Sequence, residues 1–166
     1  MDALEALRTR RSHRAYRPDP VPREALEQMV DCGRLAATAI NIQPWQFVVV
    51  TARDTLKQLA DATDHGKFIV QAGACIVVFC DEGKYYLEDG SAAIQNILVA
   101  GRALGVDTCW VAGDKKAYCP TIRDMLGLPE SYRLIGLIAA GYATDSPNPP
   151  KRPLAEVLHW ERYGGK

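Results

Sequence analysis

The spacing of hydrophobic and polar residues differs from one segment of the chain to the next. It predicts an alternation of helices and strands. Apolar residues at helical spacing predict helices near residues 3–7, 23–37, 56–60, 91–104 and 122–126. Runs of β-branched and aromatic residues predict strands over residues 45–51, 75–80, 106–111 and 134–142. This alternation favours a three-layer arrangement of helices around one sheet, and it leaves the direction of the strands open.

Three segments carry further information about their surroundings. The strand over 75–80 is apolar throughout, so we expect other elements to cover both of its faces. The helix over 91–104 is apolar on more than one side, which is typical of a central helix or of a subunit interface. The last stretch of the chain contains Pro147, Pro149 and Pro150, and this composition predicts an extended arm.

The composition narrows the classes of function. The chain has 166 residues with 20 Lys and Arg against 20 Asp and Glu, and this balance argues against a dedicated nucleic-acid binder. No apolar run approaches the roughly 20 residues of a membrane span, and the first residues do not resemble a signal peptide. The 5 cysteines contain no CxxC pair, so we expect reduced thiols, no structural metal and a cytoplasmic location. Cys119 precedes Pro120 in a predicted loop and is a minor candidate for a redox role.

A basic cluster near the start of the chain is the main candidate for chemistry. The segment Arg10–Arg14 combines arginines with a serine, and guanidinium groups with a hydroxyl are the donors that a phosphate dianion prefers. The alternative interpretation is a solvated basic loop that binds nothing. Lys151 and Arg152 form a second basic pair in the proline-rich arm. His13 and His159, taken alone, are typical of surface residues, and no histidine has metal-ligand spacing.

The segment from Asn41 to Trp45 is the other unusual stretch. The amides of Asn41 and Gln43 present both donors and acceptors, which suits the edge of a heterocycle or a polyol chain. Pro44 fixes the backbone at the entry to the predicted strand. The alternative is a plain connection between a helix and a strand, with Trp45 as core filler.

Several segments, in the right order along the chain, resemble the motifs of the FMN-dependent nitroreductase family. Residues 10–16, RRSHRAY, are similar to its RRSxRxF opening, and residues 41–47, NIQPWQF, are similar to its NxQPWxF motif. Residues 104–113, LGVDTCWVAG, resemble its LGLGTCWIGG segment. Later matches lie at residues 126–130, 141–143 and 151–154.

The resemblance implies an α+β fold with a central mixed sheet between helices and an extended C-terminal arm. It implies one small FMN-binding domain over residues 1–166, with the arm at about 144–166. It also implies a homodimer with one FMN in each of two interface sites, each built from both subunits.

The resemblance further assigns roles to individual residues. Arg10, Ser12 and Arg14 would hold the FMN phosphate, with Arg11 adjacent, and Lys151 or Arg152 would complete that site. Asn41 and Gln43 of the partner subunit would face the flavin ring and ribityl chain. Pro44 and Trp45 belong to the same motif. Backbone groups near flavin N5 and O4 would come from Val111, Ala112 and Gly113.

The function implied is hydride transfer from NAD(P)H, through flavin N5, to a small electron-poor acceptor such as a nitroaromatic or a quinone. The cycle would be ping-pong, with no catalytic side chain and no metal, and with no nucleic acid or membrane as partner. The alternatives are another flavin reaction on the same fold, namely metabolite dehydrogenation, dehalogenation or flavin fragmentation, or a non-enzymatic flavin-binding protein. A phosphate-binding or nucleic-acid-binding module that uses the arginines alone is a further alternative.

Overall fold

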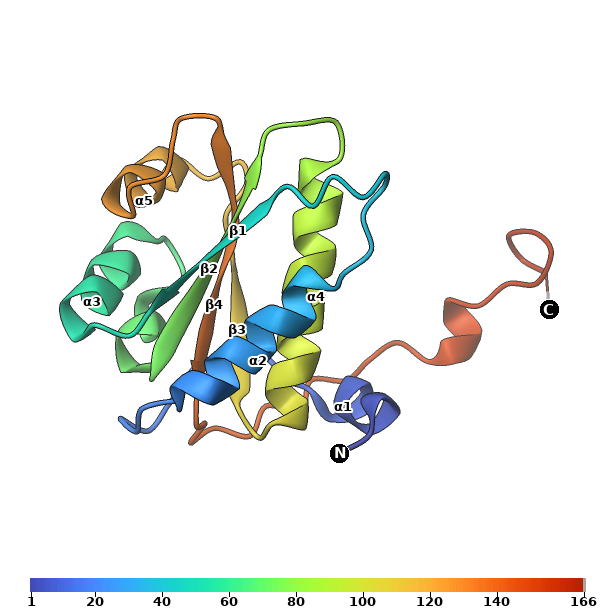
Figure 1. Ribbon diagram of the computed structural model, residues 1–166. Helices are drawn as coiled ribbons and strands as arrows, with labels where there is room; N and C mark the ends of the chain where they lie inside the picture. The colour runs from blue at the N-terminus through green and yellow to red at the C-terminus, as the bar shows by residue number, and fades with distance from the viewer. Residues whose placement is uncertain (166) are drawn as a thin grey trace.

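A four-stranded sheet with helices on both faces forms the body of the protein (Figure 1). The computed structural model describes residues 1–165. Its helices are α1 (Ala3–Thr9), α2 (Arg23–Arg34), α3 (Arg53–Ala62), α4 (Tyr86–Ala103) and α5 (Cys119–Met125). Its strands are β1 (Trp45–Val50), β2 (Ala74–Asp81), β3 (Asp107–Ala112) and β4 (Tyr132–Gly141). Two short 3-10 helices are η1 (Lys67–Gln71) and η2 (Leu154–Glu156).

The sheet confirms the α+β class and corrects the expected direction of its strands. The order is β1-β2-β4-β3, and each of the three neighbouring pairs is antiparallel. The expected mixed sheet is therefore wrong for the four strands of residues 1–165. A parallel contact is present as an isolated bridge between Ser12 and Thr108. The apolar pattern could not decide direction, because an antiparallel strand covered on both faces is as apolar as a parallel one.

Two hydrophobic cores lie on opposite faces of the sheet and confirm the three layers. Along β2, Ile76 and Val78 pack toward α2 and α4, whereas Val77 and Phe79 pack toward α3 and α5. All these side chains are buried. Covering helices on both sides therefore explain why residues 74–80 of this strand are all apolar, whereas Asp81 at its end is exposed.

Helix α4 is the central helix of its layer and begins earlier than the hydrophobic pattern indicates. Residues 88–90 are Glu-Asp-Gly, which is unlike the apolar pattern that follows, yet Asp89 and Gly90 are buried within the first turns. A Cβ at Gly90 would lie 2.7 Å from Ile135 and 2.9 Å from Cys80, so the glycine lets α4 approach the sheet closely. The close contact at this end of α4 fixes the helix against β2 and β4.

The C-terminal arm runs away from the body of the molecule, as Figure 1 shows in red. Beyond Gly141 the described residues form η2 and otherwise extended or turning chain, in agreement with the proline content. Leu154 is 70% exposed and Trp160 is 61% exposed, which is unusual for large apolar side chains. The last residue of the expected arm, Lys166, lies outside the described residues.

Most of the cysteines lie where the sequence predicts, and Cys119 does not. Cys75, Cys80 and Cys109 are buried free thiols, as expected. Cys119 begins helix α5 and does not lie in a loop, because Pro120 occupies the first turn, where a proline is tolerated. Within residues 1–165 no helix combines the length and the apolar character that crossing a membrane requires.

Candidate functional site

The basic segment, residues 10–14, is held against the start of edge strand β3. The His13 N–H donates to the Thr108 carbonyl at 3.1 Å, and Ser12 forms its parallel bridge with the same residue. Strand β3 pairs with β4 along its other edge. The basic segment therefore covers part of the edge of β3 that does not pair with β4. We call this the free edge of β3.

Cations and a hydroxyl of the basic segment gather around Cys109. Burial raises the pKa of the Cys109 thiol, and the Arg14 charge, a hydrogen bond with Ser12 and the Arg10 charge oppose that rise. Arg14 is exposed, whereas Arg10 and Ser12 are half-buried. Arg14 Nη1 donates to the Ser12 carbonyl at 3.4 Å, so a guanidinium group and a hydroxyl-bearing residue are close together near the surface, and such donors suit phosphate.

Arg11 points to a different partner from the other arginines of the segment. Its Nε and Nη2 donate to the Asn148 side-chain oxygen at 3.2 and 2.9 Å. Its Nη1 donates to the Arg8 carbonyl at 2.9 Å. Arg11 therefore fastens the beginning of the arm to the basic segment, and it does not face the same place as Arg10 and Arg14.

The link between Arg11 and Asn148 brings the second basic pair into the neighbourhood. Lys151 follows Asn148 by three residues, so it lies within about 10 Å of it along the chain. Arg152 already pairs with Glu156, Nε to Oε2 at 3.3 Å, and donates to the Glu156 carbonyl at 3.1 Å. Of the two expected cations, Arg152 is thus the one that has an acidic partner in the arm, and within residues 1–165 no ion pair of Lys151 is found.

His13 is not a surface residue, contrary to expectation. Its side chain is only 12% exposed, and its ring lies between two carboxylates, with Nδ1 2.8 Å from Asp145 and Nε2 3.5 Å from Asp107. No local pattern could show this, because both partners are far from His13 in the sequence. The histidine, Asp107 and Asp145 are the residues of this region that sequence reasoning missed.

Asp145 also fixes the backbone of the basic segment. Its second carboxylate oxygen accepts the Arg14 N–H at 2.9 Å. Burial alone would raise the pKa of Asp145, but the bonds from the Arg14 N–H and the His13 side chain outweigh it and lower that pKa. Since the folded pKa lies below the unfolded value of about 3.9, this attachment stabilises the fold above that pH and is lost as the pH falls further.

The second expected motif forms a surface loop with its amides exposed. Asn41 and Gln43 both have left-handed backbone, with φ of 59° and 55°, and Gln43 Nε2 donates to Asn41 Oδ1 at 3.1 Å. Such backbone is tolerated by asparagine and is unfavourable for glutamine, and it is found preferentially at functional sites. Trp45 is buried in the core, so its side chain fills the alternative role of core residue.

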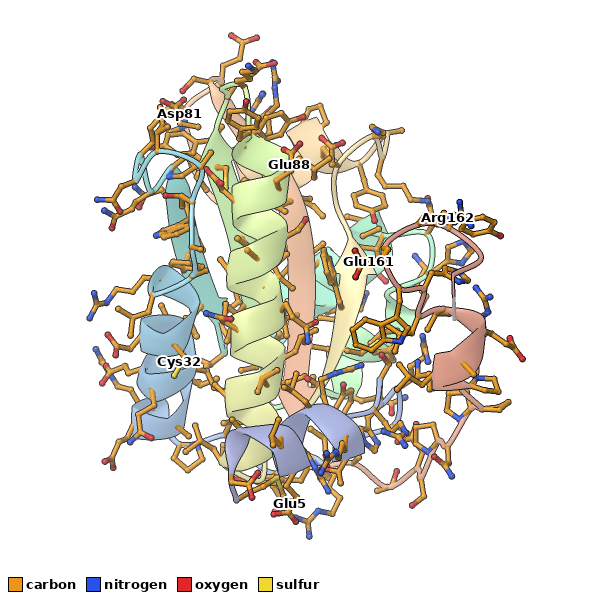
Figure 2. All side chains as sticks on the ribbon, turned by 90° about the vertical axis from the view of Figure 1, so that its right-hand side faces the viewer. Glu5, Cys32, Asp81, Glu88, Glu161 and Arg162 are labelled. Carbon is orange, nitrogen blue, oxygen red and sulfur yellow. The ribbon has the colours of Figure 1, made fainter. Side chains whose placement is uncertain are left out.

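The two motifs lie at opposite ends of α4 within one chain. The loop is tied to the first turns, where the Ala39 N–H donates to Asp89 at 3.2 Å, and α1 is tied to the last turn, where Arg102 Nε donates to Thr9 at 3.0 Å. Thirteen residues of helix separate these contacts, or about 20 Å. Figure 2 shows the same separation, with Glu88 near one end of α4 and Glu5, on α1, across the other.

The far end of β3 offers backbone groups, but not all of those expected. The Gly113 N–H donates to the Ile135 carbonyl, and the Gly113 carbonyl accepts from Lys116 N–H and from Cys119 Sγ. The Ala112 carbonyl accepts from the Tyr118 hydroxyl. Because successive residues of a strand alternate in direction, the N–H of Ala112 points toward the same free edge as the Thr108 carbonyl. Of the three expected residues, Ala112 is thus the one whose N–H can donate to a ligand on that edge.

Trp110 lies between the two ends of this edge. Its side chain is 37% exposed, and a Cβ at Gly136 would overlap the indole. The missing side chain on β4 therefore creates the space in which the indole lies. Trp110 is at once packed on the sheet and available as an apolar wall.

Comparisons with known proteins agree on one family. The model of the nitroreductase family matches residues 7–74 and 67–142. A protein of Archaeoglobus fulgidus named "Putative NADH dehydrogenase/NAD(P)H nitroreductase" is 34% identical over 151 residues, which cover 87% of each chain.

Solved structures agree with the family match. A crystal structure of a protein with the same name from Bacteroides thetaiotaomicron is similar at a TM-score of 0.91 and 30% identity, covering 97% of this chain and 98% of the other. A "putative nitroreductase in complex with FMN" from Desulfovibrio desulfuricans has a TM-score of 0.84 and 31% identity, covering 98% of both chains.

Proposed function

Because this chain belongs to the nitroreductase family, we propose that it is an FMN-dependent oxidoreductase that accepts a hydride from NAD(P)H. The hydride is passed to a small electron-poor acceptor such as a nitroaromatic or a quinone, in a ping-pong cycle. The observation that carries the proposal is the position of Ser12 and Arg14 on the free edge of β3, where Ser12 forms its bridge with Thr108 and Arg14 Nη1 donates to the Ser12 carbonyl at 3.4 Å. The complex of the Desulfovibrio relative with FMN supports the choice of cofactor.

The phosphate end of the cofactor fits the basic segment. Arg10 and Arg14 can donate paired N–H groups to phosphate oxygens, and Ser12 can add a hydroxyl donor. Lys151 is our candidate for the additional cation from the arm, since Arg152 pairs with Glu156. Arg11 holds the arm in place through Asn148 and acts as a positioning residue.

The ring end of the cofactor fits the other end of β3. Thr108 and Ala112 are about 14 Å apart along the strand, so a ligand anchored near Cys109 can extend along the free edge to Ala112. Flavin, when bound, supplies the hydride chemistry, while the protein supplies binding, orientation and electrostatics. With flavin bound, the Ala112 N–H would donate to it at this end, and Trp110 would provide an apolar wall beside it. No side chain is required as a nucleophile.

A homodimer completes the site in this proposal. The exposed amides of Asn41 and Gln43 lie about 20 Å along α4 from the basic segment of the same chain. A second copy can bring its own loop to the ring end, as the resemblance implies. The exposed apolar residues of the arm, including Leu154 and Trp160, support an intimate association between the two copies.

The proposal treats residues 1–166 as one cofactor-binding domain and the dimer as cytoplasmic. A single sheet with a core on each face supports the first statement. The free, mainly buried cysteines support the second, because reduced thiols are typical of the cytosol.

The spectrum of the purified protein and its turnover test this function. We expect flavin absorption bands at about 370 and about 450 nm. We also expect repeated oxidation of NADH or NADPH per site when a nitroaromatic or a quinone is supplied. Bound flavin without turnover would favour a non-enzymatic flavin carrier or a different flavin reaction. Colourless protein that takes up no added FMN would refute the proposal.

Dilution tests whether the site needs both copies. If the loop of Asn41 and Gln43 comes from the partner subunit, the loss of dimer on dilution should release FMN over the same range of protein concentration. Mass photometry and flavin fluorescence, measured on the same dilution series, compare the two. A monomer that retains its FMN would contradict a site built from two chains.

A further inference from the structure

The His13 ring joins three separate parts of the chain behind the basic segment. Nδ1 lies 2.8 Å from Asp145, which follows β4, and Nε2 lies 3.5 Å from Asp107, which begins β3. Asp145 also accepts the Arg14 N–H at 2.9 Å. We call His13, Asp107 and Asp145 the histidine clamp.

Each member of the clamp is itself held in place. Asp107 accepts the Ala143 N–H at 3.0 Å through its other oxygen, and Arg102 Nη1 lies 3.8 Å from the oxygen that faces His13. The His13 carbonyl accepts the Tyr16 hydroxyl at 2.6 Å. The ring therefore has little freedom to move without breaking several contacts.

The clamp orients the ring through its Nδ1 nitrogen. Both carboxylates are acceptors only, so the Nδ1–H donates to Asp145 at 2.8 Å, and Asp107 lies 3.5 Å from Nε2 on the other side of the ring. The charged groups that face His13 are Asp107 and Asp145, with Arg102 behind Asp107.

The His13 side chain points inward, and its two neighbours, Ser12 and Arg14, are residues that we propose contact the cofactor phosphate. Successive side chains of an extended segment point to opposite sides. His13 is 12% exposed, whereas Arg14 is exposed and Ser12 is half-buried. Fixing His13 therefore fixes the directions in which Ser12 and Arg14 present their donors.

We infer that His13 is a positioning residue for phosphate recognition, because its ring, held between Asp107 and Asp145, clamps the basic segment in place. This inference rests on the proposed function. In a dry, hydrogen-bonded setting, a preorganised donor loses less entropy on binding than a mobile one does. The clamp thereby contributes to the preference for a flavin that carries a phosphate over one that does not.

The test compares two flavins that differ only in the phosphate. FMN and riboflavin are titrated, by fluorescence quenching, into flavin-free preparations of the full chain and of His13→Gln. We expect the dissociation constant for FMN to rise about tenfold or more, as for the loss of a charge-assisted contact, and that for riboflavin to stay within about twofold. His65→Gln, which changes an exposed histidine, is the matched control and should alter neither constant.

Asp145→Asn provides a second variant that keeps the ring and the size of the side chain. It should also raise the dissociation constant for FMN more than that for riboflavin, because only one carboxylate then faces the His13 ring. A parallel loss of affinity for both flavins, or no change for either, would overturn the inference and leave the proposed function intact. Absence of FMN binding by the unaltered protein would instead refute the proposed function.

Discussion

Replacing Arg10 and Arg14 together by alanine should weaken FMN binding by roughly several hundred-fold or more. The reason is the loss of two charge-assisted contacts to phosphate, each worth roughly 1.5–3 kcal/mol. Isothermal titration of flavin-free protein with FMN measures the change directly. The variant should also lose its yellow colour on dialysis, since the complex dissociates at low concentrations of free cofactor.

The matched control removes the same amount of charge elsewhere. Arg23→Ala with Arg34→Ala changes two arginines on α2, each paired with a carboxylate of its own helix. Both are exposed, so this variant should bind FMN as the unaltered protein does. Unchanged binding in the Arg10 and Arg14 variant would remove these residues from the phosphate site. An equal loss in both variants would point to the net charge of the protein and not to a specific site.

Gly113→Ala should lower the free energy of unfolding by roughly 1–3 kcal/mol. A Cβ at this position would lie 2.7 Å from the Ile135 carbonyl carbon and 2.8 Å from the Gly136 nitrogen. Both are backbone atoms of β4, so no side chain can rotate to relieve the contact. The end of β3 would have to separate from β4. Denaturant unfolding, followed by circular dichroism, measures the difference.

Gly83→Ala is the matched control for this substitution. Gly83 has no atom within 4 Å of the position where a Cβ would be added. The same methyl group should therefore change the free energy of unfolding by no more than about 1 kcal/mol. A Gly113→Ala variant as stable as Gly83→Ala would show that β3 and β4 are not held in the close contact described.

Most elements of the fold could be predicted from the period of the apolar residues. Strand β2 and the body of α4 follow their hydrophobic patterns closely, because burial alone determines those positions. The start of α4 could not be predicted in this way. Asp89 and Gly90 resemble loop residues in the sequence and are buried only because the helix packs closely against the sheet at that point.

Some residues of the candidate site could be predicted from the sequence, and others could not. Arg10, Ser12 and Arg14 lie in one short segment, so their types and spacing are visible in the sequence. The histidine clamp is not visible, because Asp107 and Asp145 reach His13 only through the order of the strands. Arg11 is the converse case. It belongs to the same motif as its neighbours, yet its side chain extends to Asn148 in the arm.

The bond between Arg11 and Asn148 joins residues that are 137 positions apart in the sequence. Asp145, which fixes the Arg14 backbone, also lies in the last part of the chain. A chain still emerging from the ribosome lacks these late residues, and its basic segment has neither anchor. We therefore expect the basic segment to be held in place only after residues 145–148 have been synthesised and have folded back onto it.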